Sequence, residues 1–152
     1  MNDPRSIKAS QAALMVTADD TEASFYDSLQ HGDLDRLMSV WSEDDEIACV
    51  HPGGPRAVGL AAIRASFEAV LSQGALQVTA EQVRRLETAT CAIHHVTEKI
   101  QAMTPDGLQV AYVMATNVYL RTSQGWRMVL HHASPGQPHD MPDVTELGAT
   151  LH

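Results

Sequence analysis

Hydrophobic residues change their spacing near Gly74, and this change constrains the fold of the 152-residue chain more than any other feature. Before it, apolar residues recur three and four positions apart, which predicts amphipathic helices over 18–31, 33–41 and 60–71. After it, four long β-type runs occupy 76–86, 90–103, 108–121 and 126–134. Three helices followed by a meander of antiparallel strands predict an α+β fold.

The short spacers between the β-type runs predict hairpins, and tight hairpins fix a register. If Met103 pairs with Leu108 across the turn between the second and third runs, His94 lies opposite Asn117. If Arg121 pairs with Trp126 across the turn between the third and fourth runs, Asn117 lies opposite Leu130 and Ala115 opposite His132. One face then carries His94, Val96, Glu98, Ile100, Ala111, Val113, Ala115, Asn117, Tyr119, Trp126, Met128, Leu130, His132 and Ser134. The other carries His95, Thr97, Lys99, Tyr112, Met114, Thr116, Val118, Arg127, Val129 and His131. A slip of one residue would exchange the faces of a strand.

Charge and cysteine content exclude several classes of partner. Ten Lys and Arg face nineteen Asp and Glu, which gives a net charge of −9. Phosphate backbones and anionic membranes need clustered cations, so we expect neither nucleic acid nor a membrane as a partner. Cys49 and Cys91 form no CxxC motif, and the polar 1–11 segment has no apolar signal core. These features favour a cytoplasmic protein.

Three segments together resemble a known family. They are FYDSLQHGDLD from Phe25 with Val40-Trp41-Ser42, CVHPGG from Cys49 with Gly59, and NVY from Asn117 with GWRMVLHHASP from Gly125. The chain resembles the SnoaL-like, ketosteroid-isomerase-like branch of the nuclear-transport-factor-2-like superfamily over about 18–135. The resemblance implies a cone: a curved antiparallel sheet, mixed at its edge, wrapped over three N-terminal helices. Segments 1–17 and 136–152 would form an arm and an irregular tail.

The resemblance implies a pocket at the open end of the cone and frequent homodimers through the outer face of the sheet. It does not imply one activity, because relatives include isomerases, dehydratases, polyketide cyclases, epoxide hydrolases and proteins with no known reaction. We expect the dimer to use Tyr112, Met114, Thr116, Val129 and His131.

His132 is the strongest candidate for proton transfer, since it combines a central strand, the inner face and a titratable group near neutrality. Its alternative role is structural, holding a strand end by hydrogen bonds. His51 before Pro-Gly-Gly either reaches the mouth of the cone or satisfies carbonyls of its own loop. Trp41 either lines the pocket or fills the core. The predicted pocket residues are Trp41, His51, Asn117, Tyr119, Trp126, Met128 and Leu130.

Two further groups have weaker signals. Glu98 falls on the inner face, where a carboxyl would have a raised pKa and suit a proton shuttle. We favour the alternative in which its strand frays or bulges and Glu98 meets solvent. Adjacent histidines point to opposite faces of a strand, and His94 and His132 stand on strands about 9.5 Å apart. We therefore predict no metal and no cofactor.

The predicted function is acid–base catalysis on a small molecule in an apolar pocket, of the isomerase, dehydratase or cyclase kind. The alternative is a ligand-binding or dimerisation module of the same fold without catalysis. A histidine–carboxylate contact at the pocket floor would favour the enzyme. A pocket closed by Trp41, Trp126 and Met128 would favour the module.

Overall fold

A computed structural model describes residues 15–146, and it has the α+β architecture that the sequence predicts. The helices are α2 (Ala18–His31), α3 (Leu34–Ser39) and α4 (Leu60–Val70), the last followed by the 3-10 turn η1 (Leu71–Gln73). The strands are β1 (Ala48–Val50), β2 (Arg56–Val58), β3 (Gln77–Glu87), β4 (Cys91–Thr104), β5 (Gly107–Thr122) and β6 (Gly125–Ala133). The arm predicted over 1–17 and the end of the predicted tail lie largely outside the described residues.

Local signals explain where the helices begin and end. Thr17 and Asp20 form a capping box, each side chain accepting from the backbone N–H of the other. Gly32 closes α2 in the left-handed conformation, with φ of 65°, which glycine adopts without strain. Asp33 then caps α3. This helix ends at Ser39, before the predicted Trp41, because Trp41 forms a parallel bridge to Met128 of β6.

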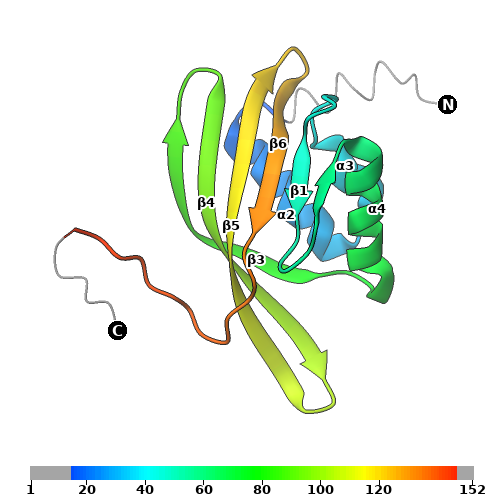
Figure 1. Ribbon diagram of the computed structural model, residues 1–152, viewed down its shortest axis with the longest axis vertical. Helices are drawn as coiled ribbons and strands as arrows, with labels where there is room; N and C mark the ends of the chain where they lie inside the picture. The colour runs from blue at the N-terminus through cyan, green and yellow to red at the C-terminus, as the bar shows by residue number, and fades with distance from the viewer. Residues whose placement is uncertain (1–14, 147–152) are drawn as a thin grey trace.

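The six strands form one sheet in the order β2-β1-β6-β5-β4-β3 (Figure 1). Neighbours are antiparallel except β1 and β6, which run parallel and join the helical half of the chain to the end of the meander. The sheet is curved, and α2 lies behind it while α4 stands beside β1 and β2 (Figure 1). The β4–β5 hairpin projects beyond the other elements (Figure 1).

The register between β4 and β5 is the predicted one, with His94 opposite Asn117. The register predicted between β5 and β6 is wrong beyond the turn. A bulge adds one residue to β6, so that Val118 pairs with Leu130, although Tyr119 pairs with Met128. An added residue exchanges the faces of everything that follows it.

The exchange moves the last histidines of β6. His131 faces inward and is buried, opposite Asn117, while His132 is exposed on the outer face. The predicted inner placement of His132 and Leu130 and the predicted outer placement of His131 are therefore wrong. Val129 also packs against the core.

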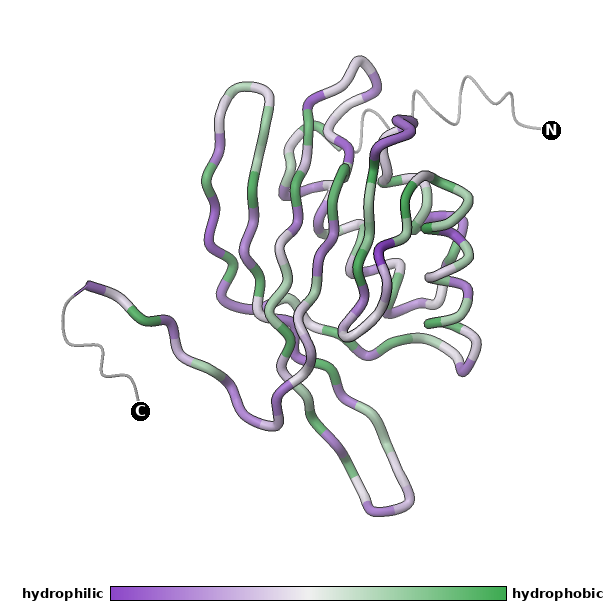
Figure 2. Tube along the Cα trace, viewed as in Figure 1, coloured by the Kyte–Doolittle hydropathy of each residue, from purple (hydrophilic) through white to green (hydrophobic). Residues whose placement is uncertain are grey.

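The main hydrophobic core lies between α2, α4 and the inner face of the sheet, around Phe25, Leu37, Ile63, Phe67 and Val96. Hydrophobic and hydrophilic residues alternate along much of the strands (Figure 2), as expected when one face of a sheet is buried. Both cysteines are free. Among the described residues, no helix is long and apolar enough to span a membrane.

Candidate functional site

Polar side chains form a connected cluster inside the apolar core, between α2 and the sheet. We call this cluster the buried polar network; its members are Glu22, Tyr26, His94, Glu98, Asn117, Tyr119 and His131, each at most 5% exposed. Glu22 and Tyr26 lie one turn apart on α2 and therefore share the face that meets the sheet. The other members come from β4, β5 and β6. Polar groups buried this deeply must satisfy one another.

At one end of the network, a single oxygen of Glu22 accepts three hydrogen bonds. Its Oε2 receives the hydroxyl of Tyr119 at 2.7 Å and lies 2.8 Å from His94 Nδ1. The amide of Asn117 donates to the same oxygen at 3.4 Å. Three donors replace the water that a charged carboxylate loses on burial.

His94 lies between two carboxylates. Its Nδ1 contacts Glu22, and its Nε2 lies 3.0 Å from Oε1 of Glu87, at the end of β3. Burial disfavours the charged imidazole, but the hydrogen bonds to Glu22 and Glu87 outweigh burial and raise the pKa of His94.

At the other end of the network, Glu98 has a single side-chain hydrogen-bond donor within residues 15–146. Tyr26 donates its hydroxyl to Glu98 Oε2 at 2.7 Å, and Asn117 donates to that hydroxyl at 2.9 Å. Burial raises the pKa of Glu98 to about 7; the charge of Glu22 adds to the rise, and the bond from Tyr26 opposes it. Glu98 is therefore a carboxyl that gains and loses its proton near neutral pH.

His131 completes this end of the network. Its Nδ1 lies 2.6 Å from Oδ1 of Asn117, which can only accept, so Nδ1 carries the proton and Nε2 presents a lone pair. That Nε2 lies 3.9 Å from Glu98 Oε2, a gap too long for a hydrogen bond. Burial, and then the neighbouring His51 and His132, lower the pKa of His131 to about 3, so it stays neutral.

Aromatic rings surround His131. The ring centroids of Phe25, Phe67 and His51 lie 5.1, 6.5 and 6.5 Å from that of His131. His51 is half-buried, and its Nε2 lies 3.0 Å from the hydroxyl of Ser66 on α4. Burial lowers the pKa of His51. His51 is thus the partly exposed ring of the three, since Phe25 and Phe67 are buried.

The predicted pocket residues separate into three groups. Asn117 and Tyr119 belong to the buried polar network. Trp41 and Met128 are core residues, and Trp126 packs partly buried against that core. Among the described side chains, Trp41 Nε1 is the one buried polar atom without a hydrogen-bond partner. Whether these residues bind a ligand stays a prediction.

Leu130 and His132 lie outside this arrangement. They line a shallow depression of about 410 Å³ on the outer face of the sheet, together with His95, Met114, Ala115, Thr116 and Ser134. The bulge in β6 separates them from the interior, so His132 cannot contact the network across the sheet. Its alternative, buried structural role is also excluded, because His132 is exposed.

Sequence reasoning missed Glu22 and Tyr26 and wrongly favoured a solvent-exposed Glu98. The available signal was the spacing of Phe25 and Leu29 on α2, because Glu22 and Tyr26 flank that apolar stripe at helical intervals. A carboxylate and a phenol on a buried helix face indicate a polar partner in the sheet.

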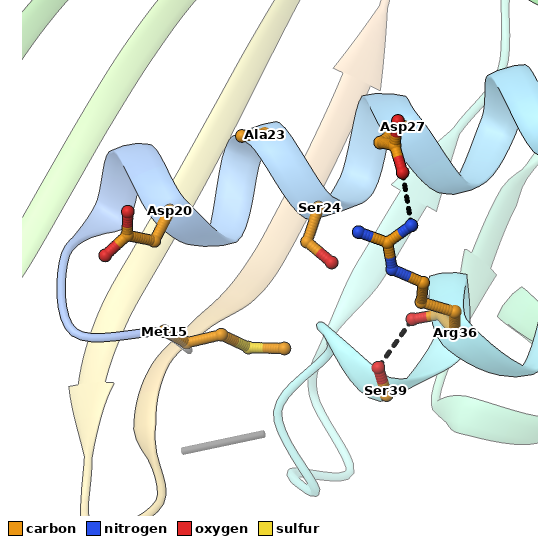
Figure 3. A pocket seen from close by; sticks show the side chains of 7 residues that line it. All are labelled: Met15, Asp20, Ala23, Ser24, Asp27, Arg36 and Ser39. Atoms are coloured by element: carbon orange, nitrogen blue, oxygen red, sulfur yellow. Dashed lines mark hydrogen bonds and ion pairs between the residues drawn. The ribbon is translucent and has the colours of Figure 1, made fainter. Parts of the chain in front are cut away.

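Another depression on the described surface lies elsewhere. It measures about 520 Å³ and is lined by Met15, Asp20, Ala23, Ser24, Asp27, Arg36 and Ser39. Figure 3 shows Arg36 of α3 reaching toward Asp27 of α2, with which it forms an ion pair. None of these seven residues belongs to the buried polar network.

The fold and the network define a cone-shaped α+β protein with an ionisable interior, and comparisons with known proteins assign its family. The model of the SnoaL-like domain matches residues 19–138, and the chain belongs to this family. A candidate calcium/calmodulin-dependent protein kinase type II association domain from Thiobacillus denitrificans is 34% identical. That match covers 82% of this chain and 98% of the other, with a TM-score of 0.74.

Two further solved structures have the same fold, and one of them is named as a member of the nuclear-transport-factor-2-like (NTF2-like) family. A candidate dehydratase of the NTF2-like family from Streptomyces avermitilis is 28% identical, covers 86% of this chain and 97% of its own, and has a TM-score of 0.69. A ketosteroid isomerase-like protein from Erwinia carotovora atroseptica shares the fold at 14% identity, with a TM-score of 0.63 and coverage of 82% and 95%. A search of curated protein sequences found no match.

Proposed function

We propose that the chain binds a small, weakly polar molecule at the His131 end of the buried polar network and transfers a proton with Glu98. The observation that carries this proposal is the pair formed by Glu98 and His131. One is a carboxyl with a pKa of about 7, and the other is a neutral imidazole with a free lone pair 3.9 Å away. A general base works best when its pKa lies near the working pH.

Glu98 Oε2 and His131 Nε2 lie 3.9 Å apart, so neighbouring groups of one ligand molecule lying beside the pair can contact both. A hydroxyl of the ligand there can donate to Nε2, while the carboxylate of Glu98 takes a proton from carbon. The proton moves from a carbon next to a carbonyl group to Glu98, leaving an enolate, and returns from Glu98 to a second position. This sequence is an isomerisation; loss of a neighbouring hydroxyl with the returned proton is a dehydration.

The surroundings of the pair support an apolar ligand. Phe25, Phe67 and His51 surround His131, and the half-buried His51 provides the approach from solvent. The two relatives described as a candidate dehydratase and as isomerase-like fit the same reaction class. We also propose a cytoplasmic location, in keeping with the two free cysteines.

Exchange of carbon-bound hydrogen tests the proposal without a known substrate. The protein is incubated in D₂O with a panel of cyclic and linear ketones and β-hydroxyketones, and NMR follows deuterium uptake at carbon. We expect uptake from at least one compound, and Glu98→Gln should slow it about 100-fold or more, because an amide cannot accept the proton.

Glu68→Gln, an exposed change on α4, is the matched control and should retain full exchange. Full exchange by a folded Glu98→Gln variant, or no exchange with any compound by the native chain, would overturn the proposal.

A second candidate function is assembly, and the outer face of the sheet favours it. Met114 is 40% exposed there and lines the depression that contains Leu130 and His132. The relative described as an association domain supports an assembling module. A homodimer through this face would use Tyr112, Met114 and Thr116, without the inward His131 of the original prediction.

Light scattering at micromolar concentration tests the dimer. Met114→Glu places a charge on the proposed interface and should give monomers if the native chain is dimeric. Met103→Glu is the matched control, because Met103 lies near the tip of the projecting hairpin and is already 79% exposed. A monomeric native chain would contradict the assembly function and leave the proton-transfer proposal unaffected.

A further inference from the structure

Three ligating side chains meet beside the network, where α2 begins and β3 ends. Asp19 lies in the first turn of α2, Glu87 is the last residue of β3, and His94 lies in β4. One ligand atom from each lies within 4.8 Å of the others. We propose that Asp19, Glu87 and His94 bind a divalent transition-metal ion of the zinc class, at a site separate from the proposed Glu98–His131 pair.

The distances fit tetrahedral coordination. His94 Nε2 lies 3.0 Å from Glu87 Oε1 and 3.9 Å from Asp19 Oδ1. Bonds of about 2.0–2.2 Å place tetrahedral ligand atoms roughly 3.3 Å apart. One of these two distances is shorter than that value and the other is longer, so small rotations of the Asp19 and Glu87 carboxylates complete the site. Asp19 and Glu87 are about half exposed, which gives them this freedom and leaves the remaining coordination position to water.

His94 is oriented as a metal ligand. Its Nδ1 contacts the buried carboxylate of Glu22 at 2.8 Å, the partner that commonly fixes the ring of a metal-binding histidine. With Nδ1–H donating to Glu22, Nε2 presents a lone pair toward the carboxylate oxygen of Glu87. Two such atoms at 3.0 Å require a cation between them, either a proton or a metal ion.

The local charge also favours a cation. Three carboxylates surround His94; they belong to Asp19, Glu22 and Glu87. A cationic side chain, Arg85, is also close, and its Nε donates to Asp19 Oδ1 at 2.8 Å. Arg85 therefore competes with the metal for Asp19. A nitrogen and carboxylate ligand set suits Zn²⁺ or Co²⁺. This inference departs from the prediction made from the sequence, which considered the strand histidines without Asp19 and Glu87.

Titration of the untagged, EDTA-treated chain with Co²⁺ and with Zn²⁺ tests the site. We expect one ion per chain by calorimetry and a visible Co²⁺ spectrum typical of tetrahedral coordination. Glu87→Gln and Asp19→Asn should each weaken the affinity at least about tenfold. Both residues are partly exposed, so these variants should keep the fold.

Two more variants separate this site from other histidines. Arg85→Gln should tighten binding by up to about fivefold, because it releases Asp19 from a surface ion pair. His132→Ala, on the exposed outer face, should leave binding unchanged. Absence of binding at millimolar ion, or binding that Glu87→Gln and Asp19→Asn leave unchanged, would overturn the proposal and leave a proton as the cation beside His94.

Discussion

Glu22 and Glu98 are both buried in the same interior, and they differ in the number of donors that reach them. Glu22 Oε2 accepts from Tyr119, His94 and Asn117. For Glu98, one side-chain donor, Tyr26, is within hydrogen-bond distance. Burial raises the pKa of Glu98. The pKa of Glu98, about 7, shows how far a carboxyl moves when its lost hydration is only partly replaced.

The difference assigns separate tasks to the two ends of the network. The Glu22 end, where donors converge on one oxygen, holds α2 on the sheet. The Glu98 end, where Glu98 Oε2 has one side-chain donor and lies 3.9 Å from His131 Nε2, is suited to moving a proton. Under the proposed function, hydrogen-bond satisfaction separates a structural carboxylate, Glu22, from the one proposed to transfer a proton, Glu98.

The largest expected effect comes from removing Glu22. Glu22→Leu leaves the Tyr119 hydroxyl and His94 Nδ1 without an acceptor and removes one of the two acceptors of the Asn117 amide. We expect a loss of about 3–5 kcal/mol in the free energy of unfolding. Glu98→Leu leaves the Tyr26 hydroxyl without its acceptor, and the free energy of unfolding should fall by about 1–2 kcal/mol at neutral pH. Urea denaturation of both variants measures the contrast. Equal losses would show that donor number does not distinguish the two carboxyls.

The pH dependence of stability should isolate Glu98. Its pKa is about 7 in the folded chain and 4.5 for the ordinary carboxyl, so the folded state holds the proton more tightly. Stability from this group is complete below pH 4.5 and decreases through pH 7, by about 3 kcal/mol in total.

His131 has the opposite sign, because its pKa is lowered to about 3 and its contribution is lost as pH falls below 6.5. The difference between the native chain and Glu98→Gln removes this shared background. Urea midpoints collected from pH 4 to 8 should show the native chain losing stability relative to the variant as pH rises. A difference that stays constant with pH would contradict the raised pKa of Glu98.

Removing the single donor to Glu98 gives a smaller effect on stability and a clear one on titration. Tyr26→Phe deletes the hydrogen bond that opposes the raised pKa, so the pKa of Glu98 should rise above 7. We expect a stability cost of about 1 kcal/mol. Carbon-13 NMR of the Glu98 carboxyl measures the titration. Tyr112→Phe, outside the network, is the control and should leave the titration of Glu98 unchanged.

The smallest effect is expected at the exposed edge of the Glu22 end. In the presence of EDTA, Asp19→Asn removes the surface ion pair with Arg85 and should change stability by less than about 1 kcal/mol. Thermal unfolding with and without EDTA measures it. If Asp19→Asn lowered the stability nearly as much as Glu22→Leu, the surface residue Asp19 would belong to the structural end of the network.

The helices, the hairpins and the pairing of His94 with Asn117 could be predicted because each depends on local pattern or a short turn. The register of β6 could not. Met128, Val129 and Leu130 are apolar in succession, so no alternation marks the residue at which the bulge occurs. Because this one extra residue was not predicted, His132 was assigned to the predicted site in place of His131.

The network itself was only half predictable. Alternation along β4 and β5 placed Asn117, Tyr119 and Glu98 on the inner face, but the partners from α2 depend on how a helix docks on a sheet. Neither helix propensity nor residue spacing predicts how far a docked helix is rotated about its own axis, and a rotation by one residue changes which side chains face the sheet. The three donors that meet at Glu22 come from two strands and are visible only in three dimensions.

The parallel pairing of β1 with β6 has a consequence for the order of folding. It joins Ala48 to Leu130, roughly eighty positions apart, whereas β4 and β5 close through a short turn. Closing a long loop costs more entropy than closing a hairpin, so we expect β1 to dock after the meander has formed. His51, which follows β1 directly, then reaches His131 in the last step, and the proposed site exists only in a chain that has finished folding.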